Sequence, residues 1–481
     1  MTGALRIATN SAAVLSLGAA ARAVGFLAFL LLSRALAPAE LGTFALVLTT
    51  VEVVRQLTEL GLGIATVRLL AADASRTTRP VAAALLLRTG LAALGLLLIL
   101  AIASHPALVE RRTLFLVGGL TLFAGAVHNS LTSAFQARLE MRHLVPAHLV
   151  SVATYLGAVS WGAAHGWGIS AFLRAYVVQE VLLAAATTLT FRARFRLEFR
   201  GLTGVIRRLA RDAAALGTLG AVVLLYYRID VFMLEAMRGS EAVGHYALAF
   251  RITEAFLLLA TALSTSSFPR LVEFAAAERD AELRSMFGVL YSGVVLSGGA
   301  VAFAVSLAAP VLMPRAFPGY AEAGALAGLL IWSVVFMFAN SQTADLLISR
   351  GRLGLVTGIA FGNLVLNAVA NALLIPRFGA AGAAAATVVT EGANAVAQAW
   401  FIRRRLGLPV PVAPWAAVAG LGGIAVSLRL GAPAVAGGLA ICGAAVAAWY
   451  GSATRGRRGD APSSQTNEAP GGAVRSGLVG S

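Results

Sequence analysis

Long, nearly uncharged runs of apolar residues constrain this chain more than any other feature of its sequence. A helix of roughly 20 apolar residues spans the hydrocarbon core of a membrane. Because lipid offers no hydrogen-bond partner, each run must satisfy its backbone polar groups within itself. Barrel strands hold only about 10 residues and alternate in hydrophobicity, which these runs do not. With 12% of 481 residues charged, about half the share of a soluble protein, the sequence predicts an all-α membrane protein.

The apolar runs predict about fourteen transmembrane helices. Their approximate ranges are 8–33, 41–67, 81–103, 113–135, 146–164, 168–191, 212–235, 242–268, 286–312, 321–348, 353–375, 380–402, 411–428 and 432–450. The first run follows Arg6 as a signal peptide would, but it is longer than the roughly 7–15 apolar residues of such a peptide. We therefore expect it to be retained as the first helix.

The distribution of arginine predicts the orientation of these helices. All 38 basic residues are arginine. With the N-terminus in the cytoplasm, the connectors and tail on that side hold 25 of them, and the opposite connectors hold 7. Cytoplasmic loops of membrane proteins carry such an excess. We therefore expect a multi-pass protein of the cytoplasmic (inner) membrane with both termini in the cytoplasm, and we attribute the net charge of +16 to topology and not to nucleic-acid binding.

A group of residues in and after the second predicted helix recurs 202 residues later without a gap. The matched pairs are Gly42 and Gly244, Phe44 and Tyr246, Ala45 and Ala247, Leu46 and Leu248, Glu52 and Glu254, Arg68 and Arg270, and Leu69 and Leu271. Because six predicted helices separate the two copies, both face the same way. The pattern predicts a parallel repeat with its pseudo-twofold axis along the membrane normal.

The repeat and the composition together divide the chain into five segments. We expect an N-terminal lobe of six helices at 1–191, a basic cytoplasmic connector at 192–211 and a C-terminal lobe of six helices at 212–402. Two further helices at 403–450 and a disordered cytoplasmic tail at 451–481 follow. Arginines interleaved with Phe and Leu indicate that the connector lies on the anionic leaflet, and the tail is rich in Gly, Ser and Pro.

Motifs that would make the chain an enzyme are missing from the sequence. Cys442 is its one cysteine, so there is no thiolate cluster for a metal and no disulfide framework. We find no Walker A loop, zinc-ligand pattern or nucleophile elbow. The sequence therefore predicts a chain that is not an enzyme, needs no cofactor and is not driven by ATP bound to it.

Several segments resemble one family of transporters. The stretch from Leu32 to Arg68, LSRALAPAELGTFAL through GLGIATVR, resembles the opening of polysaccharide flippases. Further similar segments are Arg228-Ile-Asp230, Val243-Gly-His-Tyr-Ala-Leu248, Phe268-Pro-Arg270, Asn363-Leu-Val-Leu-Asn367, Leu374-Ile-Pro376 and Gly379-Ala-Ala-Gly-Ala383. The chain is identified as similar, over residues 8–402, to the Wzx-like oligosaccharide flippases of the multidrug/oligosaccharidyl-lipid/polysaccharide (MOP) exporter superfamily.

The resemblance implies two six-helix bundles in a V-shaped arrangement around a cationic cavity, which would translocate glycans linked to a polyprenyl pyrophosphate for surface polysaccharide synthesis. The related peptidoglycan-precursor flippase has an arginine in its first helix and another in its eighth, and Arg22 and Arg251 occupy matching helices here. An aspartate follows the first arginine in that relative, whereas Ala23 stands here. This departure disfavours a peptidoglycan precursor as the substrate. The implied partners are membrane lipids, a glycan polymerase and glycosyltransferases.

Ionisable residues inside the predicted helices are the candidate site, because each costs about 2.5–3.5 kcal/mol or more at the bilayer centre and needs a cavity or a partner. A guanidinium stays charged there and offers forked donors that match phosphate oxygens. The expected substrate-binding residues are Arg22, Arg55, Arg228 and Arg251. The expected residues for proton or sodium coupling are Asp230, Glu52, Glu254 and Glu391.

Structural pairing is the alternative for each of these residues. Glu52, Arg55 and Glu59 are spaced by three and four, and Arg251 precedes Glu254 by three, so they could neutralise one another along a helix. Arg228 and Asp230 point in different directions and need other partners. His128 with Asn129, and the stripe Asn363, Asn367 and Asn371, are expected to form interhelical hydrogen bonds. Tyr226 and Tyr227 could stack on a sugar or pack between helices.

Two rival functions remain open at this stage. A cation-coupled multidrug exporter of the same superfamily would favour acidic residues in its cavity, whereas this chain places arginines in its central helices. A non-transporting scaffold for glycan assembly would depend on the connector and the tail, and would tolerate loss of the intramembrane charges.

Overall fold

The computed structural model describes residues 18, 21–59, 61–72 and 78–430. Every regular element in these ranges is helical, which confirms the predicted all-α class. The expected last helix, 432–450, and the expected tail, 451–481, lie outside the described residues. Described helices overlap the other predicted spans, with bounds that differ by several residues; of the first predicted span, 8–33, the structure describes residues 18 and 21–33.

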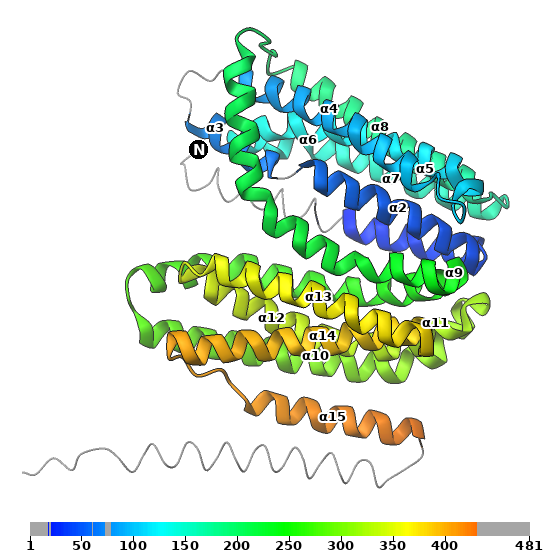
Figure 1. Cartoon of the computed structure of the whole chain (residues 1–481), viewed down its shortest axis with the longest axis vertical. Helices are drawn as coiled ribbons and strands as arrows, with labels where there is room; N and C mark the ends of the chain where they lie inside the picture. The colour runs from blue at the N-terminus through cyan, green and yellow to red at the C-terminus, as the bar shows by residue number, and fades with distance from the viewer. Residues whose placement is uncertain (1–17, 19–20, 60, 73–77, 431–481) are drawn as a thin grey trace, which may run out of the picture. The chain divides into compact units, whose positions relative to one another are not determined.

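The helices of the first half are single rods or shorter pieces in series (Figure 1). They are the helical residues 21–35, α2 (Pro38–Glu59) with α3 (Leu62–Ala72), α4 (Arg79–Ile102), η1 (Val109–Arg111) with α5 (Arg112–Gly119) and α6 (Thr121–Ala137), η2 (Met141–Leu144) with α7 (Val145–Ala164), and α8 (Ile169–Arg192).

The second half begins with one very long helical element. The elements are α9 (Leu202–Ala276), α10 (Asp280–Ala316), η3 (Pro318–Tyr320) with α11 (Ala321–Leu330) and α12 (Trp332–Ser349), α13 (Leu353–Phe378), α14 (Ala380–Phe401) and η4 (Ile402–Leu406). The range of α9 covers both the seventh and the eighth predicted helices. They join at Gly239, whose φ of 79° and ψ of 179° break the helix, a conformation that glycine adopts at little cost.

Backbone contacts divide the chain into two compact units, Met1–Pro411 and Val412–Ser481. The helix α15 (Ala413–Leu430) is the described part of the second unit and corresponds to the thirteenth predicted helix. All the other described elements belong to the first unit.

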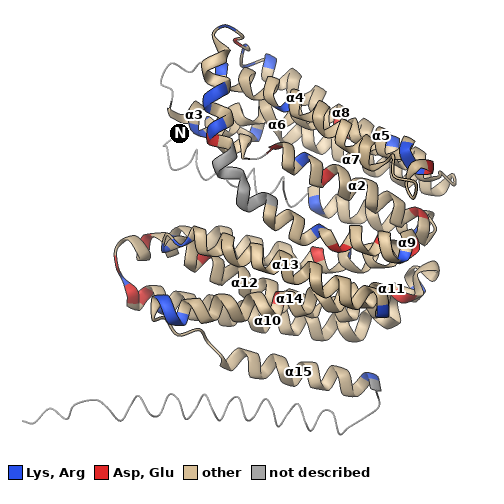
Figure 2. Ribbon diagram, viewed as in Figure 1, with Lys and Arg blue, Asp and Glu red and all other residues tan. Residues whose placement is uncertain are grey.

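Burial is distributed as expected for a protein in lipid. Eight helical segments of the described chain are long and apolar enough to cross a membrane, and a ninth is added if the bent pair α11 and α12 counts as one. Large apolar side chains such as Val289 and Leu373 are exposed, whereas the polar Asn367 and Asn371 are buried. Figure 2 shows charged residues mainly near helix ends and where α2 meets α9. The chain is therefore a multi-pass membrane protein.

The basic connector is attached to the first half. Residues 193–201 are not helical, and α9 begins at Leu202, inside the predicted connector. The Phe195 ring is buried 5.2 Å from the ring of Phe135, and the Arg138 guanidinium lies 4.4 Å above Phe195. The hydroxyl of Thr78 donates a hydrogen bond to the carbonyl of Arg196. The predicted contact of this connector with the lipid leaflet remains a prediction.

The closest contact between α2 and α9 follows the sequence repeat. A methyl group on Gly42 would overlap the carbonyl oxygen of Ser240 and lie 2.8 Å from the nitrogen of Gly244. A methyl group on Gly244 would overlap the carbonyl oxygen of Pro38. Because Ser240 follows Pro38 by the same 202 residues that separate the two glycines, the contact is reciprocal. The two helices lie side by side at this crossing (Figure 1).

Candidate functional site

Two adjoining cavities, of about 200 and 790 Å³, lie beyond this crossing. Both are lined by Glu52 of α2, Tyr176 of α8, and Arg251 and Glu254 of α9. Residues of the first helix, 21–35, line each of them as well. The cavities are therefore built from helices of both halves of the repeat.

The positions of Glu52 and Glu254 along their helices follow from the position of the glycine crossing. Glu52 and Glu254 each come ten residues after a contact glycine, which is about 15 Å further along an α-helix. At this depth the space between α2 and α9 holds the cavities and not a packed contact. The repeat thus places two equivalent carboxylates at one level of the same cavity.

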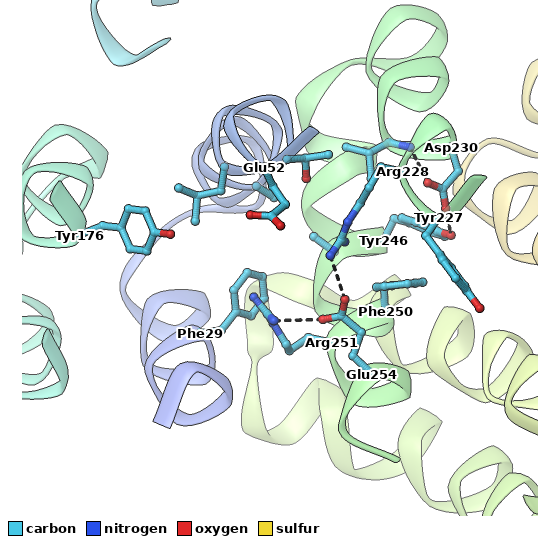
Figure 3. A pocket seen from close by; sticks show the side chains of 15 residues that line it. Phe29, Glu52, Tyr176, Tyr227, Arg228, Asp230, Tyr246, Phe250, Arg251 and Glu254 are labelled. Atoms are coloured by element: carbon cyan, nitrogen blue, oxygen red, sulfur yellow. Dashed lines mark hydrogen bonds and ion pairs between the residues drawn. The ribbon is translucent and has the colours of Figure 1, made fainter. Parts of the chain in front are cut away.

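The Glu254 carboxylate is shared by two arginines (Figure 3). Arg228 Nη2 donates to Glu254 Oε1 at 3.1 Å, and Arg251 Nη1 donates to Glu254 Oε2 at 2.9 Å. The Arg251 guanidinium lies 4.6 Å above the ring of Phe29, and that of Arg228 lies 5.7 Å above Phe250. Aromatic faces at these distances attract a cation and help to fix its position. The predicted pair of Arg251 with Glu254 is confirmed.

The first half contributes the other two predicted arginines. Arg55 forms an ion pair with Glu52, as the spacing predicted, and lines the larger cavity. Arg22 lines this cavity too, is exposed, and forms neither an ion pair nor a hydrogen bond with the part of the chain that the structure describes. Within that part, Arg22 is the cavity arginine whose charge no carboxylate balances.

Glu59 departs from the expected local pairing. It accepts a hydrogen bond from Arg88 Nη2 at 3.0 Å and another from Asn129 Nδ2 at 2.6 Å. Arg88 is 3% exposed and also donates to Ser130 Oγ at 3.2 Å. Glu59 therefore neutralises an arginine of α4 and not Arg55, because its side chain faces the interior of the first half.

The remaining acidic candidates are buried in hydrogen-bond networks of the second half. Asp230 lines the smaller cavity but is 4% exposed, and it accepts hydrogen bonds from the Tyr246 hydroxyl and from the Val231 nitrogen, the latter at 2.9 Å. Glu391 of α14 lines neither cavity. Its carboxylate accepts from Tyr226 at 2.8 Å and from Asn340 at 2.7 Å. Seven of the eight predicted site residues thus meet at the cavities, and Glu391 does not.

Some of the polar residues expected to join helices do so. His128 Nδ1 of α6 lies 2.9 Å from the hydroxyl of Thr187 of α8, and Asn367 of α13 donates to Thr390 of α14 at 3.2 Å. Asn371 instead donates within α13, to the Asn367 side chain at 2.9 Å, and Asn363 Nδ2 is buried without a hydrogen-bond partner among the described residues. Among the described residues, no group of three or more His, Cys, Asp or Glu could hold a metal ion.

Apart from Tyr227, the aromatic lining was not predicted from the sequence. Phe29, Tyr176, Tyr227, Tyr246 and Phe250 all line the smaller cavity (Figure 3). The match of Phe44 with Tyr246 in the repeat was a usable signal for one of them. For Phe29 and Tyr176, nothing in an apolar helix distinguishes an aromatic ring that lines a cavity from one that faces lipid.

The profile of the family described as "Polysaccharide biosynthesis protein" matches residues 7–275. The chain belongs to this family. The family membership predicted from the sequence is thereby confirmed. No curated protein is matched by the sequence.

Solved structures share the fold of this family member. A structure titled "Lipid II flippase MurJ, inward closed conformation" has a TM-score of 0.70 at 10% identity, with 91% of this chain and 98% of that chain covered. A MATE transporter in complex with MaD3S has a TM-score of 0.60 at 15% identity, over 84% and 96% of the two chains. A MOP superfamily transporter from Pyrococcus furiosus has a TM-score of 0.58 at 15% identity, over 84% and 95%. The chain therefore shares the fold of these MOP superfamily transporters.

Proposed function

We propose that this transporter is a flippase for oligosaccharides linked to a polyprenyl pyrophosphate, which it carries across the cytoplasmic membrane for surface polysaccharide synthesis. One observation carries the proposal: in a member of a polysaccharide biosynthesis family, arginines from both halves line two adjoining cavities that share lining residues. Arg22 and Arg55 come from the first half, and Arg228 and Arg251 come from the second.

The chemistry of the cavities fits a pyrophosphate head group. A phosphate entering a low-dielectric space needs fixed cations to replace its hydration, and guanidinium forks bind its oxygens with defined geometry. The aromatic rings around Arg228 and Arg251 offer flat apolar faces, and sugar rings stack on such faces. The polyprenyl tail stays in the lipid while the polar head occupies the cavities.

Alternating access accounts for the close contact of α2 with α9 at one end of the cavities. The crossing at Gly42 and Gly244 lies at the helix ends that the arginine distribution assigns to the outer side. On the same side, Arg111 donates to Glu235 Oε1 at 2.7 Å and to Ser240 Oγ at 2.6 Å. These contacts support a state closed to the outside, in which the cavities receive substrate from the cytoplasm.

Ion coupling would supply the driving force. Asp230 and Glu391 are buried carboxylates that accept hydrogen bonds from tyrosine hydroxyls, and Glu52 and Glu254 line the cavities. Carboxylates that bind a proton or sodium in one state and release it in the other would link transport to an ion gradient. A glycan polymerase and glycosyltransferases are the partners that such a flippase requires.

The test is the export of surface glycan in cells that depend on this protein. Separate variants Arg22→Ala, Arg228→Ala and Arg251→Ala should each lower export by at least about tenfold, because each removes a charge-assisted contact worth more than 1.4 kcal/mol. Arg207→Ala, which removes an exposed arginine at the start of α9, is the matched control and should export normally. Wild-type export by all three cavity variants, at normal levels in the membrane, would contradict the proposal.

A further inference from the structure

The site contains an anion of its own at the place where a substrate anion would bind. Each of the two Glu254 oxygens accepts a hydrogen bond from a different guanidinium, at 3.1 Å from Arg228 and at 2.9 Å from Arg251. A phosphate group uses two oxygens in the same way to bridge two arginines. We propose that Glu254 is an internal counter-anion, which holds the two arginines when the cavity is empty and which the pyrophosphate of the substrate displaces.

The charges around Glu254 explain why displacement is needed. Arg228 and Arg251 carry two positive charges on side chains that are 27% and 34% exposed, and the Glu254 carboxylate balances one of them. A pyrophosphate diester brings about two negative charges. If it bound to these two arginines beside an ionised Glu254, three negative charges would face two guanidiniums, and of the other cavity arginines Arg55 is already paired with Glu52. Departure of the carboxylate leaves both guanidiniums to the head group.

The geometry leaves donors and space for this exchange. Arg228 Nε is buried without a hydrogen-bond partner among the described residues, so this guanidinium has an unused donor next to the one that binds Glu254. The Glu254 side chain is 25% exposed and lines both cavities. It can rotate towards the larger cavity without entering a packed helix contact.

The other half of the repeat provides an internal comparison. Glu52 is the repeat counterpart of Glu254 and lies in the same cavities, but its ion pair is with Arg55 alone. Glu254 therefore bridges two arginines from separate parts of α9, whereas Glu52 pairs with one neighbour on its own helix. A ligand that replaces Glu254 must also offer two oxygens, one for each of the two arginines. A single phosphate oxygen cannot do this.

The inference rests on the proposed function, and a binding experiment separates the two. Inorganic pyrophosphate and orthophosphate are titrated calorimetrically into the full-length protein in lipid nanodiscs. Glu254→Gln should bind pyrophosphate about tenfold more tightly than the wild type, because a like charge leaves the site. Glu254→Asp, which keeps the charge on a shorter side chain, should change affinity less. Glu52→Gln should raise affinity less than Glu254→Gln, since it frees one arginine and not two.

The outcomes distinguish failure of the counter-anion role of Glu254 from failure of the proposed flippase function. Unchanged or weaker pyrophosphate binding by Glu254→Gln, with Arg228→Ala and Arg251→Ala still weakening it, would overturn the counter-anion and leave the proposed function intact. Equal pyrophosphate affinity for wild type, Arg228→Ala and Arg251→Ala would overturn both. Melting temperatures of the nanodisc samples confirm that each variant is folded before it is titrated.

Discussion

Replacing Gly42 with alanine should open the contact that closes one end of the cavities. The added methyl group would overlap the carbonyl oxygen of Ser240, and it would lie 2.8 Å from the nitrogen of Gly244. Both obstacles are backbone atoms, so no side-chain rotation can relieve them. The helices α2 and α9 must move apart at the crossing, or the state with this crossing must lose stability.

The magnitude follows from two opposing terms. Overpacking a tight contact costs about 1–3 kcal/mol, and replacing a helical glycine by alanine returns up to about 1 kcal/mol through helix propensity. A net cost of about 1–2 kcal/mol shifts the equilibrium roughly 5- to 30-fold towards states in which the crossing is open. Gly244→Ala should act in the same direction through the Pro38 carbonyl, and the double variant should add little, because both substitutions disturb one contact.

Chemical labelling measures this shift. In a Cys442→Ser background, Ala45→Cys places a thiol on the cavity wall, close to the crossing. A membrane-impermeant maleimide, added from the predicted outer side, should label this thiol about 5- to 30-fold faster when Gly42→Ala is present. Gly90→Ala is the control, since a methyl group there would meet nothing within 4 Å. Equal labelling rates with and without Gly42→Ala, in a stable protein, would refute the role of this crossing.

Two further predictions concern ion pairs outside the cavities. Arg88→Leu should lower the free energy of unfolding of the purified protein by about 3–5 kcal/mol, because it leaves the Glu59 carboxylate without its partner. A melting curve measures this loss. The double variant with Glu59→Leu should recover most of it. Glu235→Gln should speed the outer-side labelling of Ala45→Cys by less than about tenfold, because the Arg111 side chain is 33% exposed and such pairs contribute about 1 kcal/mol or less. An unstable double variant, or labelling slower than in the wild type, would contradict these two expectations.

The helices were predictable because the bilayer imposes a simple rule of length and hydrophobicity on each of them. The contacts that span three residues on one helix were predictable as well, since helix geometry places Arg55 beside Glu52 and Arg251 beside Glu254. The break between the seventh and eighth predicted helices was predictable as well, because Arg238, Ser240 and Glu241 interrupt the apolar run there, and the helix breaks at Gly239.

The sequence could indicate which polar residues form contacts between helices, but it could not identify their partners. Arg228 lies 26 residues before Glu254, and they meet because α9 folds back at Gly239. Glu391 carries the same signal as Glu254, a carboxylate in an apolar helix, yet it is 1% exposed and bound to Tyr226 and Asn340. Hydrophobicity shows that such a group needs partners. Only the packing of neighbouring helices decides whether those partners are protein side chains or the contents of a cavity.

The reciprocal glycine crossing has a consequence for the origin of the chain. In a symmetric dimer of a half-length protein, one glycine per subunit would have created both close contacts at once, since a twofold interface uses the same patch on each partner. Fusion into one polypeptide would then have freed the two patches to change independently. The crossing is symmetric, whereas ten residues further on one copy holds a single guanidinium and the other holds two. A single chain that contains both copies can therefore acquire an asymmetric site. A dimer of identical subunits could not.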